Sequence, residues 1–140
     1  MTARPDSVID MLDHISIQAT DVDAAAAFYL DVFGPLGFRE AMRHEDGDTT
    51  VVGIAGPDGF PRFWLGAQVD AGSRPIHLAF TAASKEAVDE VHALVVARGG
   101  EILHAPRQWP EYHDHYYGVF FRDPDGNNVE AVCHSVTPEG

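Results

Sequence analysis

Three residues, His14, His77 and Glu130, have the types and the setting of a metal site. Each stands in or beside a segment that alternates apolar and polar residues, as a strand with one buried face does. Glu130 interrupts the apolar run 129–132, and a buried carboxylate is costly unless it is paired, hydrogen-bonded or bound to a cation. Two neutral imidazoles and a carboxylate on rigid strands suit a divalent transition metal and leave positions open for water or substrate.

An internal repeat relates the two histidines. The segment "HISIQATDVDAAAAFYLDVFGPLGF" begins at His14, and "HLAFTAASKEAVDEVHALVVARGGE" begins at His77. Superimposing the histidines also matches Ala19 with Ala82, Ala24 with Ala87, and Gly37 with Gly100. A Pro-Asp-Gly turn follows in each half, at 57–59 and at 124–126. Such a repeat predicts two similar modules, in which a pseudo-two-fold axis would bring His14 and His77 together.

Hydrophobic periodicity predicts the same order of elements in each half, a strand, a helix and then further strands. Thr20 or Asp21 is placed to cap the first helix, and Ser84 to cap the second. Gly34 and Gly37 are expected to end the first helix, and Gly99-Gly100 the second. The expected helices cover about 21–34 and 84–98, and the expected strands cover about 12–19, 49–55, 61–67, 77–82, 101–105, 116–122 and 128–134. The segment 105–118 is polar and contains proline, and it is predicted to be a loop.

Each of the three residues also has an ordinary structural explanation. A single histidine on a strand is usually a core or rim residue, and a glutamate on a C-terminal strand is often a solvated edge residue. The metal hypothesis is favoured because all three share the face of their strands that the helices do not cover, and because two of them are related by the repeat. Since imidazole must lose its proton to bind a metal, occupancy is expected to fall as the pH drops towards ~6 and below.

Composition excludes several other classes. The 140 residues carry 9 basic and 22 acidic side chains, a formal net charge of −13, which argues against nucleic acid or an anionic membrane as partner. No apolar run approaches ~18 residues, and the first ten residues lack an apolar signal core, so a cytoplasmic protein without a membrane span is expected. The single cysteine, Cys133, excludes an internal disulfide and has the strand parity of a core residue.

The segments "LDHISIQATDVDAAAAFYLDVFGPLGF", "PIHLAF" and "YHDHYYGVFFRDPDGNNVEAVCH" resemble the vicinal oxygen chelate superfamily, the glyoxalase, bleomycin-resistance and extradiol-dioxygenase group. The resemblance covers about 11–135 and is strongest to small glyoxalase-like proteins with a strand of the "RFWLG" type. It implies an α+β fold in which two βαβββ modules, about 11–70 and 75–135, form a cupped mixed sheet within a single domain, 1–140. It also implies a homodimer.

Members of that superfamily typically take one ligand from the first and one from the last strand of each module. Carried over, this implies metal ligands at His14, His77 and Glu130, with Glu130 also the catalytic candidate. The last-strand position of the first module is assigned to Phe63, which cannot bind a metal, so three protein ligands are expected. One divalent ion, Fe, Mn, Co, Ni or Zn, is the implied cofactor. Three residues are predicted to contact the substrate: Phe63, His113 and Tyr117.

Three functions follow from this resemblance. The first is a metal-dependent lyase, isomerase or transferase that acts on a small substrate with two adjacent oxygens. The second is a metal-free module that binds or sequesters a small molecule, such as an antibiotic. The third is a non-haem iron dioxygenase, which the ligand set permits but the chain length disfavours, because such members usually have four modules. Retention of both histidines and the glutamate favours the first function over the second.

Overall fold

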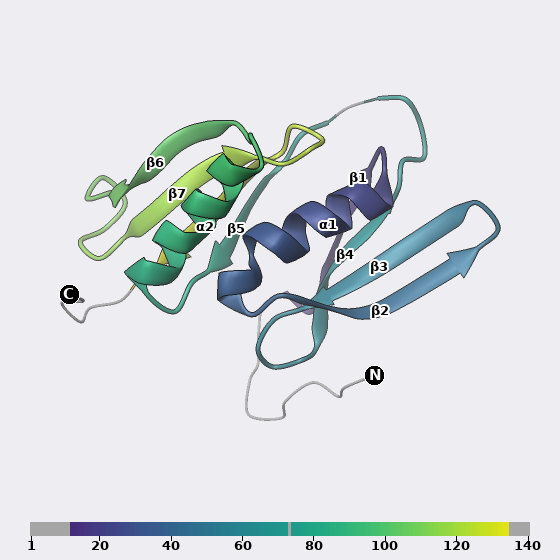
Figure 1. Cartoon of the computed structure of the whole chain (residues 1–140), viewed down its shortest axis with the longest axis horizontal. Coiled ribbons are helices and arrows are strands. Elements are labelled where there is room, and N and C mark those ends of the chain that lie inside the picture. Colours follow the sequence, from purple (N-terminus) through teal and green to yellow (C-terminus); the bar gives the residue numbers. More distant parts are fainter. Residues whose placement is uncertain (1–11, 73, 135–140) are drawn as a thin grey trace. The chain divides into compact units, whose positions relative to one another are not determined.

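Two compact units of the same architecture make up the chain, one up to residue 73 and one from residue 74 onward (Figure 1). The computed structural model describes residues 12–72 and 74–134. Within these residues, each unit contains a four-stranded mixed sheet and an α-helix that follows the first strand. The predicted α+β fold with two βαβββ modules is therefore confirmed.

In unit 1 the sheet has the strand order β1-β4-β3-β2. β1 pairs with β4 in parallel, and the other two pairs are antiparallel. A short 3-10 helix, η1, follows α1 and ends at Gly37, whose φ of 86° suits glycine. The elements are β1 (Ile15–Ala19), α1 (Val22–Val32), η1 (Gly34–Leu36), β2 (Arg39–Asp46), β3 (Thr49–Ala55) and β4 (Pro61–Ala67).

Unit 2 repeats this topology with the strand order β5-β8-β7-β6, and β5 again pairs in parallel with the last strand, β8. The predicted caps are confirmed, since Asp21 accepts a hydrogen bond from the Ala24 amide at 3.0 Å and Ser84 from the Ala87 amide at 3.1 Å. The elements are β5 (His77–Thr81), α2 (Lys85–Ala97), β6 (Ile102–Gln108), β7 (Tyr117–Arg122) and β8 (Asn128–Cys133).

Each helix buries an apolar stripe on one face of its own sheet. In unit 1, Tyr29 of α1 is fully buried and its ring meets Phe63 of β4 edge-on at 4.8 Å. In unit 2, α2 packs on β6, β7 and β8. Its buried residues are Ala87, Val88, Val91 and Val95. No helix within the described ranges is long and apolar enough to cross a membrane.

The edge strands β2 and β6 depart from the sequence expectation. β2 is not predicted, because its residues are almost all exposed and lack an apolar face. β6 continues to Gln108, so the predicted loop 105–118 begins four residues too early. Pro106 is tolerated there because β6 is an edge strand with irregular pairing between His104 and Arg107.

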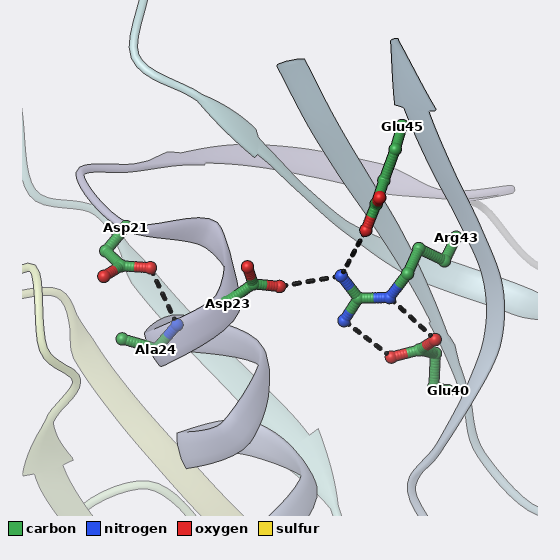
Figure 2. A network of polar contacts seen from close by, with 6 residues as sticks. All are labelled: Asp21, Asp23, Ala24, Glu40, Arg43 and Glu45. Atoms are coloured by element: carbon green, nitrogen blue, oxygen red, sulfur yellow. Dashed lines mark hydrogen bonds and ion pairs between the residues drawn. The ribbon is translucent and has the colours of Figure 1, made fainter. Parts of the chain in front are cut away.

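Arg43 links the exposed edge strand β2 to α1 (Figure 2). Its guanidinium donates to Asp23 of α1 at 2.7 Å, to Glu40 at 3.0 and 3.1 Å, and to Glu45 at 3.3 Å. These carboxylates, Glu40 first, hold the pKa of Arg43 above its ordinary value. The network is solvent-exposed, so it orients β2 more than it stabilises the fold.

The turn between β7 and β8 is organised by a buried carboxylate, Asp123, which is 5% exposed. Its Oδ1 accepts the amides of Asp125 and Asn127 at 2.9 and 2.8 Å, and its Oδ2 accepts the Asn127 side-chain amide at 2.8 Å. The Asn127 Oδ1 then accepts the backbone amide of Ile76 at 2.8 Å. The turn therefore fixes the start of β5, where His77 stands.

Asp123→Ala is expected to lower the free energy of unfolding by about 2–3 kcal/mol, because it leaves buried amide donors without an acceptor. Chemical denaturation measures this change. Asp48→Ala, in the exposed turn between β2 and β3, is the control and should change stability by less than about 0.5 kcal/mol. Equal stability of the two variants would contradict the role given to Asp123.

Candidate functional site

Glu130 lies in the middle of β8, a central strand, and is 1% exposed. It pairs with Phe120 of β7, whereas the alternate residues of β7, such as Tyr117, face α2. Its side chain therefore points to the sheet face opposite α2, which we call the Glu130 face. Two groups meet it there: His77 Nε2 lies 3.1 Å from Oε1, and the Tyr116 hydroxyl donates to Oε2. The Tyr116 bond satisfies one oxygen of this buried carboxylate, and the other oxygen faces the imidazole.

The His77 ring is oriented by the backbone of β8. Its Nδ1 lies 3.0 Å from the carbonyl oxygen of Asn128. A carbonyl only accepts hydrogen bonds, so Nδ1 carries a proton and the Nε2 of the neutral ring is a lone pair. That lone pair faces the Glu130 Oε1, and two acceptors at 3.1 Å need a proton or a cation between them. A metal ligated through Nε2 fits this arrangement, because ligating histidines usually donate their other N–H to a carbonyl or carboxylate.

Tyr116, which the predicted substrate contacts do not include, makes the second contact with Glu130. Burial, and then the hydrogen bond to Glu130, raise the pKa of its hydroxyl, so the phenol keeps its proton and remains a donor. Gly118 leaves room for this contact, since a Cβ there would lie 3.3 Å from the Glu130 Oε2. Strand parity could have indicated it, because Tyr116, Gly118 and Phe120 alternate on the Glu130 face.

His14, the predicted third ligand, stands just before β1 in unit 1 and is exposed. Its Nδ1 lies 2.9 Å from Asp13 Oδ1, which leaves Nε2 as the lone-pair nitrogen of the neutral ring. Over the described residues, no three His, Cys, Asp or Glu side chains form a group that could hold a metal ion. Unit 2 thus brings together His77 and Glu130, and the participation of His14 stays a prediction.

Phe63 does not occupy the position that sequence reasoning gave it. The parallel pairs match Ile15 with Phe63 in unit 1 and Leu78 with Val129 in unit 2, so Trp64, one residue later, is the counterpart of Glu130. Phe63 is 3% exposed and packs on α1, which makes it a core residue rather than a substrate contact. The alignment was one residue out of register because it lacked the strand pairing.

The structure also corrects the assignment of Tyr117. It lies on the α2 side of β7, where its hydroxyl donates to Asp89 at 2.7 Å and the Lys85 ammonium lies 5.6 Å from its ring centre. It therefore faces away from Glu130 and does not support a role in substrate binding. The residue before it, Tyr116, makes the contact with Glu130.

His113, the remaining predicted substrate contact, stands beside Tyr116, with ring centres 5.4 Å apart. Its Nδ1 accepts the His115 amide at 3.2 Å, so its Nε2 carries the proton and donates to His134 Nδ1 at 2.7 Å. His134 follows directly after β8. The pair fastens the loop before β7 to the end of β8, and the substrate role of His113 stays a prediction.

An aromatic layer surrounds the Glu130 carboxylate. The His77 ring stacks on Phe120 with ring centres 6.0 Å apart, and Trp109 meets Phe120 edge-on at 5.1 Å. The Trp109 indole also donates to the Gly118 carbonyl at 3.1 Å, and Trp109 is only 7% exposed. These contacts support the imidazole and lower the local polarity, which strengthens electrostatic interactions at Glu130.

Residues 11–131 match the family described as Glyoxalase/Bleomycin resistance protein/Dioxygenase superfamily. The chain is 32% identical to the uncharacterised protein PA2024 of Pseudomonas aeruginosa over 127 residues, 85% of each chain. It is similar to the structure of lactoylglutathione lyase from Agrobacterium tumefaciens, with 28% identity, a TM-score of 0.62, and 93% and 96% of the two chains covered. The fosfomycin resistance protein FosX of Listeria monocytogenes, complexed with Mn(II) and sulfate, shares the fold at 20% identity, a TM-score of 0.65, and 92% and 96% coverage.

Tyr117 offers a pH test of the observed register. Burial, and then its hydrogen bond to Asp89, raise the pKa of Tyr117 to about 12. Because this folded value exceeds the unfolded value of about 10, the stabilisation is present below pH ~10 and is lost as the pH rises towards ~12. Tyr117→Phe should therefore reduce the alkaline loss of stability and remove one late phenol from an ultraviolet titration. Loss of an early-titrating phenol instead would place Tyr117 in solvent.

Proposed function

Because this chain belongs to the glyoxalase, bleomycin-resistance and dioxygenase superfamily, we propose that it is a glyoxalase-like, metal-dependent enzyme of the lyase, isomerase or transferase type. Its substrate would be a small molecule that presents two adjacent oxygens. The observation that carries the proposal is the pairing of the His77 Nε2 lone pair with the buried Glu130 carboxylate at 3.1 Å.

The proposed ligands are His77 through Nε2, Glu130 through Oε1, and His14 through Nε2. Both histidines turn Nδ1 to an oxygen acceptor, the Asn128 carbonyl for His77 and the Asp13 carboxylate for His14. In both histidines this leaves Nε2 available to bind the proposed metal. The ion, of the Fe, Mn, Co, Ni or Zn class, would act as a Lewis acid that polarises a substrate carbonyl or stabilises an enediolate.

The catalytic proposal for Glu130 rests on its burial. Of the residues that the structure describes, the buried acids are Asp123 and Glu130. Asp123 is engaged in the turn before β8, with three hydrogen bonds to its two oxygens. Glu130 instead lies beside a half-exposed imidazole, since the His77 side chain is 50% exposed. A buried carboxylate next to a solvent-accessible ligand position is suited to holding a cation or a proton at the substrate.

The relatives are consistent with this proposal. One is a lactoylglutathione lyase, and another, FosX, was crystallised with Mn(II). Their substrates are not carried over, because fold and family do not determine the reaction. The aromatic layer at Glu130 and the adjacent His113 are the proposed substrate surroundings.

A metal-free binding module is the second candidate, and one observation favours it. If His77 is protonated on both nitrogens, its Nε2–H donates to Glu130 Oε1 and satisfies the carboxylate with no metal. The Glu130 face would then hold a small molecule without transforming it. Metal uptake separates the two candidates.

Chelator-treated wild-type protein is expected to bind one divalent ion per chain from a panel of Mn, Fe, Co, Ni and Zn. His77→Ala and Glu130→Gln should each weaken binding by about a hundredfold or more, because each removes a ligand. His14→Ala should do the same if it completes the set. Isothermal titration and elemental analysis measure these affinities, and circular dichroism verifies the fold.

His44→Ala and His92→Ala are the matched controls, since neither residue belongs to the proposed ligand set; His44 lies on β2, and His92 lies on α2, which covers the sheet face opposite Glu130. Both variants should bind metal as the wild type does. If the wild type takes up no ion from the panel, the enzyme proposal is wrong and the binding module replaces it. If only His14→Ala retains full affinity, the third ligand was misassigned.

We also propose a homodimer, the association expected of small members of this superfamily. Multi-angle light scattering should give a mass near twice that of the 15.2 kDa chain, and the mass should not change on dilution through the micromolar range. A single-chain mass throughout that range contradicts the dimer.

A further inference from the structure

The two oxygens of Glu130 have different partners. Oε1 faces His77 Nε2 at 3.1 Å, whereas Oε2 accepts the Tyr116 hydroxyl. From this division we infer that Tyr116 is a positioning residue that makes Glu130 a one-oxygen metal ligand and so keeps a coordination position open for the substrate. The inference rests on the proposed metal site and assigns the tyrosine a role in it.

The chemistry of the pair favours a permanent donor. A phenol that donates to a carboxylate makes a charge-assisted bond, stronger than a bond between neutral groups. As long as this bond persists, the lone pairs of Oε2 are directed at the phenol, and Oε1 is the oxygen that remains for a cation beside His77.

Packing holds the phenol at this oxygen. The Tyr116 ring contacts three other rings, those of Tyr112 at 4.8 Å, His134 at 5.2 Å and His113 at 5.4 Å between centres. The backbone is fixed as well, since the Tyr116 carbonyl accepts the Trp109 amide at 2.7 Å. A ring held on several sides loses little further freedom in donating its hydrogen bond, which is the condition for a positioning residue.

Gly118 is the second requirement. A Cβ at this position would lie 3.3 Å from Glu130 Oε2 and 3.5 Å from Cε1 of Tyr116, on the line along which the two side chains meet. The same Cβ would lie 3.2 Å from the Ala131 carbonyl oxygen, so the strand has little room to yield. Glycine thus permits the close approach of phenol and carboxylate.

The consequence concerns the coordination positions left for substrate. A carboxylate that binds through both oxygens takes two positions on an ion, and one that binds through a single oxygen takes one. A substrate that chelates through two adjacent oxygens needs two neighbouring positions. On a six-coordinate ion with three protein ligands, a second Glu130 oxygen would reduce the positions left for substrate and water from about three to two, so the Tyr116 bond leaves more room for a chelating substrate.

Tyr116→Phe removes the hydroxyl that donates to Glu130 and keeps the ring. Tyr117→Phe is the control, because it makes the same change on the opposite face of β7. Three quantities are measured for each protein: the affinity for Mn²⁺, by isothermal titration; the water exchangeable at the bound ion, by water-proton relaxation; and the affinity of the Mn²⁺-loaded protein for acetohydroxamate, a probe that chelates through two adjacent oxygens. Melting of the metal-free proteins verifies that both variants fold.

Tyr116→Phe is expected to bind Mn²⁺ within about threefold of the wild-type affinity, to lose about one exchangeable water, and to bind acetohydroxamate about tenfold or more weakly. Tyr117→Phe should match the wild type in all three.

If Tyr116→Phe keeps the wild-type water count and probe affinity, the inference is wrong and the metal site stands. Loss of Mn²⁺ binding by more than a hundredfold also overturns it, since Tyr116 would then be needed for binding itself. A wild type that binds no divalent ion overturns both proposals.

Discussion

The burial of the Glu130 carboxylate is the constraint on which unit 2 depends. A carboxylate at 1% exposure is costly by several kcal/mol unless its oxygens have polar partners, and each oxygen of Glu130 has one. The partners come from the two sides of β8, His77 at the start of β5 and Tyr116 just before β7. Since each strand must stand in one register for its side chain to reach the carboxylate, the site and the sheet specify one another.

The parallel pairing of β5 with β8 has a chemical effect beyond holding the sheet together. It places His77 opposite Asn128, so that the carbonyl of Asn128 fixes the ring while Glu130, two residues on, meets its other nitrogen. A slip of one residue would exchange the faces of β8 and direct Glu130 at α2. The turn prevents this slip, because Asp123 orders Asn127 and Asn127 binds the amide of Ile76. The contacts that set the register of β5 and β8 therefore also orient the His77 ring.

Sequence periodicity predicts the elements that bury an apolar face, and it does not reveal the elements that lack one. The helices and the central strands alternate visibly, so their bounds were predicted to within a few residues, and the shared parity of His77 and Glu130 indicated their meeting. The edge strand β2 is polar on both faces and gave no signal. Phe63 was placed one residue out of register, since alignment of two weakly similar halves does not reveal strand pairing. Tyr117 was chosen without the strand pairing that puts Tyr116, rather than Tyr117, on the face of Glu130.

The two units share one topology, but one equivalent pair of residues on their last two strands differs in which residue is the larger. In unit 2 the small, charged Glu130 on the last strand faces Phe120, whereas in unit 1 the large Trp64 faces Gly53. The exchange is forced, because a Cβ at residue 53 would lie 2.8 Å from the Trp64 ring. An indole that donates its N–H to the Pro61 carbonyl has no lone pair to offer a metal. Unit 1 can thus contribute His14 but no carboxylate from its last strand. The repeat that supplies two matched histidines therefore supplies one glutamate, because the last strand of unit 1 carries Trp64 where that of unit 2 carries Glu130.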